Sequence, residues 1–327
     1  MPHMNMIEAI RSALDDEMAA DQRVFVLGED VGVKGGVFLA TDGLLKRYGE
    51  DRVVDTPIAE ISVVGLAIGA ALHGLRPVAE IQFADYIHPA IDQILNEAAR
   101  MRYRSNGDWS CPIVVRAPFG AGVHGALYHS QSAEALFTST PGLKVVAPST
   151  PYDAKGLLIA AIRDPDPVVF FEHKQFYRGE RAEVPAGGYA VPLGRAAVRR
   201  SGEHVSLYTY GLMAHYSLAA AEQVAREGVD VEVIDLRTLY PLDRQAVLES
   251  VRKTGKALIV HEDNLTGGLG GEIAALIAEH AFEHLDAPVR RLASPDVPAV
   301  AFNDDLEAHF MLSPSKIAAA IRSLAAY

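Results

Sequence analysis

Short apolar runs alternate with helical patterns along most of the chain, and this alternation limits the possible folds more than any other feature. Runs such as VFVLG at 24–28 read as buried strands, whereas segments such as 151–163 read as helices. Strands that alternate with helices indicate a mostly parallel sheet with helices on both faces, so we expect an α/β fold. The first part of the chain should contain strands at 24–28, 77–83, 112–117, 143–147 and 167–172, and helices from Ile7 onward and at 61–73, 89–104, 131–138 and 151–163.

The pattern lapses between about 173 and 203, where proline, glycine and charged residues cluster as they do in linkers. A second α/β set follows this segment. We therefore expect a first domain at 1–185, a linker at 186–203 and a second domain at 204–327. The second domain should contain strands near 204–210, 229–236, 257–261 and 288–292, and helices near 214–227, 242–253, 269–284 and 314–325.

Length and charge narrow the class of protein. The 327 residues are enough for about two domains. With 30 Lys and Arg against 42 Asp and Glu, the net charge of −12 argues against a nucleic-acid-binding surface or a polybasic membrane anchor. The single cysteine, Cys111, excludes an internal disulfide framework and suits a reducing compartment. No stretch approaches the roughly 18 apolar residues of a transmembrane helix, and MPHMNMIEAI lacks the pattern of a signal or transit peptide, so we expect a cytoplasmic protein.

Several common cofactor and catalytic motifs are absent. The sequence GGLGGE at 267–272 follows a strand, but it lacks the third glycine of a dinucleotide-binding G-x-G-x-x-G motif. The sequence KTGKA at 253–257 has neither the upstream glycine nor the Ser or Thr of a P-loop. No G-x-S-x-G or H-E-x-x-H motif occurs. A stand-alone nucleotide-binding oxidoreductase is therefore a weak alternative, and it predicts cofactor affinity without any partner.

Two segments carry candidate functional residues. Glu60 ends DTPIAE and precedes a helix in which Gly65 and Gly69, one turn apart, would let another backbone come close. On spacing alone, Glu60 is more simply explained as an acid favoured at a helix N-terminus by the helix dipole. The second segment is the loop after PIVVRA, which holds three glycines with His124 and His129. Open parallel sheets bind ligands at the carboxyl ends of their strands, and His129 is as consistent with function as with structure.

Longer motifs identify a family. DTPIAE, VVGLAIGAALHGLRPVAEIQFADYI, GVHGALYHSQS, PGLKVVAPSTPYDAKGLL, VIDLRTLYPLD and HEDNLTGGLGGEI together resemble the β subunit of the E1 component of 2-oxoacid dehydrogenase complexes. The resemblance extends from about Met6 to Tyr327. It implies a thiamine-diphosphate enzyme of the transketolase type, with a pyrimidine-binding domain followed by a smaller C-terminal transketolase-like domain.

The resemblance assigns roles at the cofactor's pyrimidine. Glu60 matches the glutamate that hydrogen-bonds the N1′ atom of the aminopyrimidine, which requires a protonated carboxyl. A desolvated site would keep this carboxyl protonated near neutral pH. Gln82 and Tyr86, in EIQFADYI, match residues beside the pyrimidine, although packing at the end of the sheet is an alternative explanation for both. Glu29, in LGEDVG, could belong to an acidic interface network or be an ordinary loop carboxylate.

The resemblance also assigns the histidine loop, and two C-terminal motifs are interface candidates by their position. His129 matches the histidine of an HSQ motif near the reactive carbon, where an imidazole would assist transfer of the acyl group to a lipoyl group. His124 and Tyr128 are weaker candidates for the substrate pocket. The HED motif at 261–263 could face a partner but reads more simply as a polar strand terminus, and Arg237 is expected to organise the domain core or an interface through a carboxylate pair.

Metal ions and partners follow from the same resemblance. A structural monovalent cation, usually K⁺, would be held mainly by backbone carbonyls. The G-D-G…N motif that binds Mg²⁺ at the diphosphate is missing, so the Mg²⁺ ligands are expected on a separate α subunit. The family then implies an α2β2 heterotetramer that works with the peripheral subunit-binding and lipoyl domains of E2. The matching K⁺ positions are Ile113, Ala161, Ile162, Asp164 and Asp166, the last of which is Asn in many relatives.

The motifs also bear on which 2-oxoacid the enzyme would use. EIQFADYI, MRYRS and GALYHSQS resemble the branched-chain members more than the pyruvate members, which favours 3-methyl-2-oxobutanoate and related 2-oxoacids. A few methylenes discriminate between substrates by only about 1–3 kcal/mol. Pyruvate and acetoin therefore remain alternative substrates, and a noncatalytic assembly subunit remains an alternative function.

Overall fold

The computed structural model describes residues 1–179 and 181–327, which form two compact units. The first unit comprises residues 1–119 and 136–193, and the second comprises residues 120–135 and 194–327. The expected linker at 186–203 spans the change of unit at Leu193 and Gly194. Residues 120–135, which the sequence-based ranges place in the first domain, belong structurally with the second unit.

The first unit is built on a parallel sheet with the strand order β6-β7-β5-β4-β2-β3. Every residue of β2, β5 and β7 is buried, which requires cover on both faces of the sheet. The fold expected from the alternating pattern is confirmed. The strands are β2 (Val24–Gly28), β3 (Val53–Asp55), β4 (Arg76–Glu80), β5 (Val114–Phe119), β6 (Lys144–Val146) and β7 (Val168–His173).

Local capping explains where the long helices of this unit begin. Helix α1 (Met6–Ala20) starts with a capping box between Asn5 and Glu8. Helix α6 (Pro151–Arg163) starts at the side-chain cap of Thr150 with proline in its first turn, and it packs against α1. Helix α3 (Glu60–Leu72) has no side-chain cap, but it carries Glu60 as its first residue. A short helix, α2 (Leu44–Tyr48), and a two-stranded antiparallel ribbon of β1 (His3–Met4) and β8 (Ala182–Glu183) complete the unit.

The regular helix expected at 89–104 is wrong. The segment contains a 3₁₀ turn, η2 (His88–Ala90), a π-helical turn, η3 (Gln93–Ala98), and a short helix, α4 (Met101–Arg104). At the end of the π turn the carbonyl of Ala99 lies against Gly142, where a Cβ atom would be only 2.0 Å away. This backbone contact comes from a loop distant in sequence, so apolar spacing within the segment could not reveal it.

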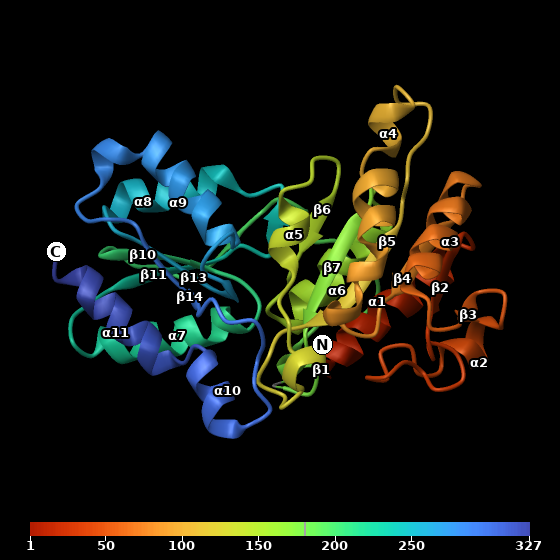
Figure 1. Cartoon of the computed structure of the whole chain (residues 1–327), viewed down its shortest axis with the longest axis horizontal. Helices are drawn as coiled ribbons and strands as arrows, with labels where there is room; N and C mark the ends of the chain where they lie inside the picture. Colours follow the sequence, from red (N-terminus) through yellow and green to blue (C-terminus); the bar gives the residue numbers. More distant parts are fainter. Residues whose placement is uncertain (180) are drawn as a thin grey trace. The chain divides into compact units, whose positions relative to one another are not determined.

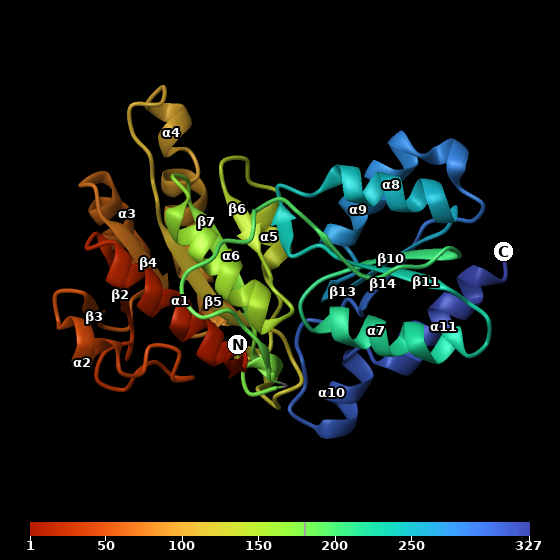
Figure 2. The same ribbon diagram turned by 180° about the vertical axis from the view of Figure 1, so that it is seen from behind.

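The second unit is a five-stranded sheet between two pairs of helices. Its strand order is β14-β13-β10-β11-β9, and only β9 runs antiparallel to its neighbour. Helices α8 and α9 cover one face and α7 and α11 cover the other (Figures 1 and 2). Strand β9 lies inside the expected linker and forms an edge of the sheet. The elements are β9 (Ala197–Arg200), β10 (Val205–Thr209), α7 (Leu212–Ala225), β11 (Val231–Asp235), β12 (Thr238–Tyr240), α8 (Arg244–Thr254), β13 (Ala257–Asn264), α9 (Leu269–His280), β14 (Arg290–Ser294), α10 (Asp304–Phe310) and α11 (Pro314–Ala325).

Among the helices of residues 1–179 and 181–327, none combines the length and apolar character needed to cross a membrane.

Candidate active site

Three polar residues meet where β2 and β4 end. Strands β2 and β4 are parallel neighbours with Gly28 opposite Glu80, so the residues that follow them share one edge of the sheet. The side-chain amide of Gln82 donates to the carbonyl oxygen of Glu29 at 3.4 Å. Burial, together with the nearby carboxylates of Asp30 and Glu60, raises the pKa of Glu29. Glu29 therefore neighbours both Gln82 and Glu60, and it joins the candidate site residues.

The residues before Glu60 are held against this edge by Asp55. Its two carboxylate oxygens accept the backbone N–H groups of Gly32 at 2.6 Å and Val33 at 3.2 Å. Glycine suits position 32, because a Cβ atom there would lie 2.7 Å from Oδ2 of Asp55 and would displace this carboxylate. The N–H of Thr56 donates to the carbonyl of Gly28 at 2.9 Å. These contacts fix the start of DTPIAE, and with it the direction from which Glu60 enters α3.

Tyr86 lies in an aromatic group at the same end of β4. It ends the 3₁₀ turn η1 (Ala84–Tyr86), and its ring packs edge-on against Phe83 with the centroids 5.9 Å apart. Phe83 in turn packs edge-on against Phe38 at 5.5 Å. The ring of Tyr86 is half-buried, so it retains an accessible surface in a fixed orientation.

Beneath these residues lies a buried ionic group that the sequence did not suggest. Arg116 on β5 forms a bidentate pair with Glu172 at 2.7 and 2.8 Å and a second ion pair with Glu80 at 2.6 Å. The hydroxyl of Tyr177 donates to Glu172 at 2.5 Å. Burial raises the pKa of Glu80 while Arg116 opposes this shift. The group ties the adjacent strands β4, β5 and β7 together below the site, and removing one partner would leave an uncompensated buried charge.

The loop that carries His124, Tyr128 and His129 belongs to the second unit. Its backbone is unusual, because His124 and Ala126 both have positive φ, at 53° and 54°. Gly125 packs against His129 so closely that a Cβ atom would lie 2.6 Å from the carbonyl oxygen and 2.7 Å from the Cβ of His129. His129 itself is half-buried, whereas His124 and Tyr128 are exposed. The loop therefore holds His129 in one position while presenting the other two side chains to solvent.

Three buried carboxylates from the second unit hold this loop, and we call Glu262, Asp263 and Glu307 the carboxylate clamp. Glu262 accepts the N–H of Ala121 at 2.6 Å. Glu307 accepts the N–H groups of Gly122 at 3.0 Å and His124 at 3.3 Å, and its other oxygen lies 2.7 Å from Nδ1 of His124.

The far end of the loop is held in the same way. Asp263 accepts the N–H of Ala135 at 3.3 Å, and the hydroxyl of Tyr210 donates to Glu134 at 2.8 Å. Burial raises the pKa of Asp263 to about 6 and raises that of Glu134 well above its ordinary value, and neighbouring carboxylates add to both shifts through like charge. Both acids therefore take up a proton more readily than an exposed carboxyl does.

Comparison with known proteins assigns the chain to a protein family. Residues 2–180 match the family described as transketolase, pyrimidine binding domain, and residues 194–317 match transketolase, C-terminal domain. The chain is 58% identical over 327 residues, all of both chains, to 2-oxoisovalerate dehydrogenase subunit beta of Bacillus subtilis. The chain belongs to the E1 β subunits of 2-oxoacid dehydrogenase complexes. It is also 46% identical over 335 residues to the Pseudomonas aeruginosa subunit of the same name, covering 98% of this chain and 94% of the relative.

Two further matches are to a pyruvate-type E1 β subunit and to a solved transketolase structure. Pyruvate dehydrogenase E1 component subunit beta of Bacillus subtilis is 52% identical over 296 residues, covering 90% of this chain and 91% of the relative. A solved structure described as a split gene transketolase, inactive beta4 tetramer, superposes with a TM-score of 0.80 and covers 99% of both chains. Its sequence identity is 24%, so this likeness shows the fold alone.

The positions expected to bind a monovalent cation in this E1 β chain gather around the end of α6. The carbonyls of Ile162 and Asp164 accept a guanidinium N–H of Arg76 at 2.8 and 3.2 Å. Ala161 accepts the N–H of Asp164, and Ile113 accepts that of Val168. Ala161 and Ile162 belong to the last turn of α6, where backbone carbonyls attract positive charge. Carbonyl oxygens with nearby carboxylates are a donor set that fits a hard monovalent cation.

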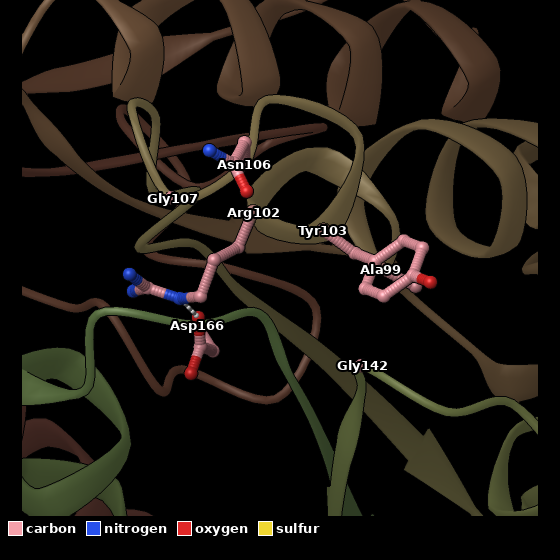
Figure 3. A pocket seen from close by; sticks show the side chains of 7 residues that line it. All are labelled: Ala99, Arg102, Tyr103, Asn106, Gly107, Gly142 and Asp166. Carbon is pink, nitrogen blue, oxygen red and sulfur yellow. Dashed lines mark hydrogen bonds and ion pairs between the residues drawn. The ribbon is translucent and has the colours of Figure 1, made fainter.

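The side chain of Asp166 is engaged on both oxygens. It pairs with Arg102 at 2.6 Å and contacts Lys144 at 3.3 Å, while Lys144 also pairs with Asp164 at 2.6 Å. Figure 3 shows the Arg102 pair at the wall of a cavity of about 600 Å³. The cavity contains none of the residues expected to bind the cofactor. It is lined by Ala99, Arg102, Tyr103, Asn106, Gly107, Gly142 and Asp166.

Within residues 1–179 and 181–327, no cluster of three or more His, Cys, Asp or Glu side chains could hold a metal ion. Sequence reasoning missed Glu307 and Glu134, and it named Glu262 and Asp263 only as part of a strand end or a partner-facing motif. Glu262 and Asp263 carry a visible signal, since they end an apolar strand before a glycine-rich turn. Glu307 carries none, because NDDLEAHF reads as an acidic surface helix.

Proposed function

We propose that this E1 β chain supplies one part of the active site of a branched-chain 2-oxoacid dehydrogenase. In the overall reaction the C1–C2 bond of the 2-oxoacid breaks and carbon dioxide leaves. The acyl group becomes a thioester on one sulfur of the E2 lipoyl group, whose disulfide accepts the electron pair and gains a thiol at the other sulfur. The observation that carries this proposal is the 58% identity, over the full length of both chains, to a 2-oxoisovalerate dehydrogenase β subunit.

Glu60 and its neighbours fit the pyrimidine half of thiamine diphosphate. The cofactor, when bound, supplies a nucleophilic carbon and an acceptor for the electrons left by decarboxylation. We assign to Glu60 a proton held at its carboxyl and donated to N1′ of the pyrimidine. Gln82 and Tyr86 would hold the edge and face of the ring, and Glu29 lies beside both Gln82 and Glu60.

His129 is assigned to acyl transfer. Imidazole is a side-chain group suited to proton transfer, which reduction of the lipoyl disulfide requires. His124 and Tyr128 are exposed side chains of the same loop and are assigned to the substrate entrance. The fixed contact between Gly125 and His129 supports this assignment, because proton transfer needs a positioned imidazole.

The metal ions and partners are part of the same proposal. Mg²⁺ at the diphosphate would be bound by residues of the α subunit, and K⁺ by the carbonyls of Ile113, Ala161, Ile162, Asp164 and Asp166. We propose an α2β2 heterotetramer in the cytoplasm, bound to the peripheral subunit-binding domain of E2. An apolar surface on α3 and the segment before it supports an interface, because Ile61 and Leu66 on the helix are 46% and 53% exposed and the preceding Ile58 is 74% exposed.

Reconstitution with the α subunit tests the proposal. We expect 3-methyl-2-oxobutanoate to be decarboxylated with a higher kcat/KM than pyruvate or acetoin. Glu60→Gln should reduce turnover by about 100-fold or more, and His129→Ala should reduce acyl transfer to a lipoyl domain by about 100-fold. Full activity in both variants would instead support a noncatalytic assembly subunit. A higher kcat/KM for pyruvate would support the pyruvate alternative, for which the 52% identity to a pyruvate E1 β subunit is the favouring observation.

The cation is tested separately. The thermal unfolding midpoint of the reconstituted enzyme should be higher in KCl than in NaCl or choline chloride at the same ionic strength. Equal midpoints in the three salts would remove K⁺ from the proposal.

A further inference from the structure

We propose that Glu262 and Glu307 are positioning residues for His129, acting through the backbone of the loop that carries it. The proposal rests on the function assigned to His129 above. It adds that the C-terminal unit, which contributes no residue to the expected cofactor set, determines the shape of the histidine loop. Every contact in the argument lies within the second unit.

The first step concerns the beginning of the loop. The N–H groups of Ala121, Gly122 and His124 point to two carboxylates that come from β13 and α10. Glu262 and Glu307 are each 3% exposed. Hydrogen bonds from N–H groups to carboxylates are shorter and stronger than neutral ones, and burial reduces the competition from water. Three donors within four residues are therefore held by groups outside the loop.

The second step concerns backbone conformation. His124 and Ala126 adopt positive φ, which is unfavourable for any residue that carries a side chain. Such a conformation persists only where surrounding contacts determine it. Glu307 contacts both the backbone and the side chain of His124, because one oxygen accepts the N–H and the other lies 2.7 Å from Nδ1, whereas Asp304 reaches only Nδ1, at 3.4 Å. Without Glu307, the backbone at His124 would relax to a more favourable conformation.

The third step connects this backbone to His129. Gly125 follows His124 directly and lies in close contact with the backbone and Cβ of His129. Closely packed groups transmit small shifts instead of absorbing them. A change in φ at His124 would therefore move the atoms on which His129 rests. Contacts of Asp263 and Tyr210 at the far end keep the loop from shifting as a rigid body.

The experiment uses the reconstituted E1 with Glu262→Gln, Glu307→Gln, His129→Ala and the double variant Glu307→Gln/His129→Ala. Asp305→Asn is the matched control, because Asp305 is an exposed acid on the same helix as Glu307. Three quantities are measured: kcat/KM with an isolated lipoyl domain, kcat/KM with a soluble artificial electron acceptor, and hydrogen exchange in peptides spanning 119–131.

We expect both glutamine variants to lose about 10- to 100-fold in kcat/KM with the lipoyl domain and less with the artificial acceptor. Exchange in 119–131 should accelerate, while exchange in β10 and β11 stays unchanged. The double variant should be no worse than His129→Ala alone, because both changes remove the same contribution. Asp305→Asn should match the wild type in every measurement.

Three results would overturn the proposal. One is a normal kcat/KM with the lipoyl domain and normal hydrogen exchange in both glutamine variants, while His129→Ala is impaired. This result would leave the function of His129 standing and show that the two glutamates do not position it. Another is additive loss in the double variant. The third result is measured on the wild type alone and remains available if the glutamine variants do not fold. If the amides of Ala121 and Gly122 exchange as fast as those of an exposed loop, the carboxylates do not hold them and the proposal is wrong. A fully active His129→Ala would overturn the assigned function of His129 itself.

Discussion

His261 explains a glycine cluster whose sequence resembles a dinucleotide-binding loop. The ring is fully buried, stacks parallel to Tyr210 with the centroids 6.4 Å apart, and has a pKa lowered by burial to about 4. Gly268 and Gly270 lie against it, and a Cβ atom at either position would come within 2.6 Å of a ring atom. The glycines of GGLGGE therefore make room for a neutral, buried imidazole, and no dinucleotide is needed to account for them.

This packing predicts that adding one methyl group at Gly270 lowers the stability of the folded protein. Gly270→Ala should reduce the free energy of unfolding by about 2 kcal/mol, because the new Cβ would overlap Nε2 of His261. Gly69→Ala is the control, since no atom lies within 4 Å of a Cβ at that helical position. Urea denaturation of the full-length variants measures both changes. A Gly270→Ala protein as stable as the wild type would contradict this explanation of the cluster.

Asp263 predicts a pH dependence at the end of the histidine loop. Its pKa of about 6 lies above the ordinary 3.8, because the side chain is buried. The folded protein therefore takes up this proton more readily than the unfolded chain. The resulting stabilisation is complete below pH 3.8 and is lost as the pH rises through 6.

Compared with Asp263→Asn, the wild type should therefore gain about 2 kcal/mol of relative stability between about pH 7.5 and about pH 4. The measurement is urea denaturation of both proteins across this range. The buried His261 weakens the folded state over the same range, but it is present in both proteins and cancels. A difference in stability that does not vary with pH would contradict the assigned pKa.

At the scale of elements, sequence patterns located helices best where local chemistry marks their ends. The expected helix at 151–163 coincides with α6, because Thr150 caps it and Pro151 fits only its first turn. Short strands such as β9 and β12 were missed, since three or four residues carry little periodicity. The break in 89–104 was missed for a different reason, namely that apolar spacing does not distinguish a continuous helix from one interrupted by a π-helical turn.

The exposed side of helix α3 is the expected interface with the α subunit, and a substitution there should weaken assembly without unfolding the chain. A Cβ atom added at Gly69 would have no neighbouring atom within 4 Å, and Ile61 and Leu66 on the same helix are exposed. Gly69→Leu should leave the unfolding midpoint of the isolated chain within about 3 °C of the wild type. It should weaken association with the α subunit by about tenfold or more, because a bulky side chain prevents close approach of another backbone.

The matched control is Gln223→Leu, which adds the same side chain at an exposed position of α7. Analytical ultracentrifugation of each variant with the α subunit measures the association. Unchanged assembly of Gly69→Leu would show that this face of α3 is not the interface.

At the scale of the whole molecule, motifs and structure revealed different parts of the candidate site. Glu60, Gln82 and His129 were expected because short motifs carry them, and the structure brings Glu60 and Gln82 to neighbouring positions around Glu29. The clamp could not be expected, because Glu262 lies 141 residues from its partner Ala121 and Glu307 lies 185 residues from Gly122. Hydrogen bonds over such separations follow from tertiary packing and leave no periodic pattern in a single sequence.

The proposed division of the cofactor site between two chains leads to the last prediction. The residues proposed to contact the pyrimidine lie at the ends of β2 and β4, whereas the sequence contains no G-D-G…N motif for Mg²⁺ and diphosphate. Most of the charge of thiamine diphosphate resides in the diphosphate, so the isolated chain should lack the larger share of the binding energy. Calorimetric titration should show no strong Mg²⁺-dependent binding to this chain alone and clear binding once the α subunit is added. Tight binding by the isolated chain would mean that it holds a diphosphate site of its own, and the division into complementary halves would then be wrong.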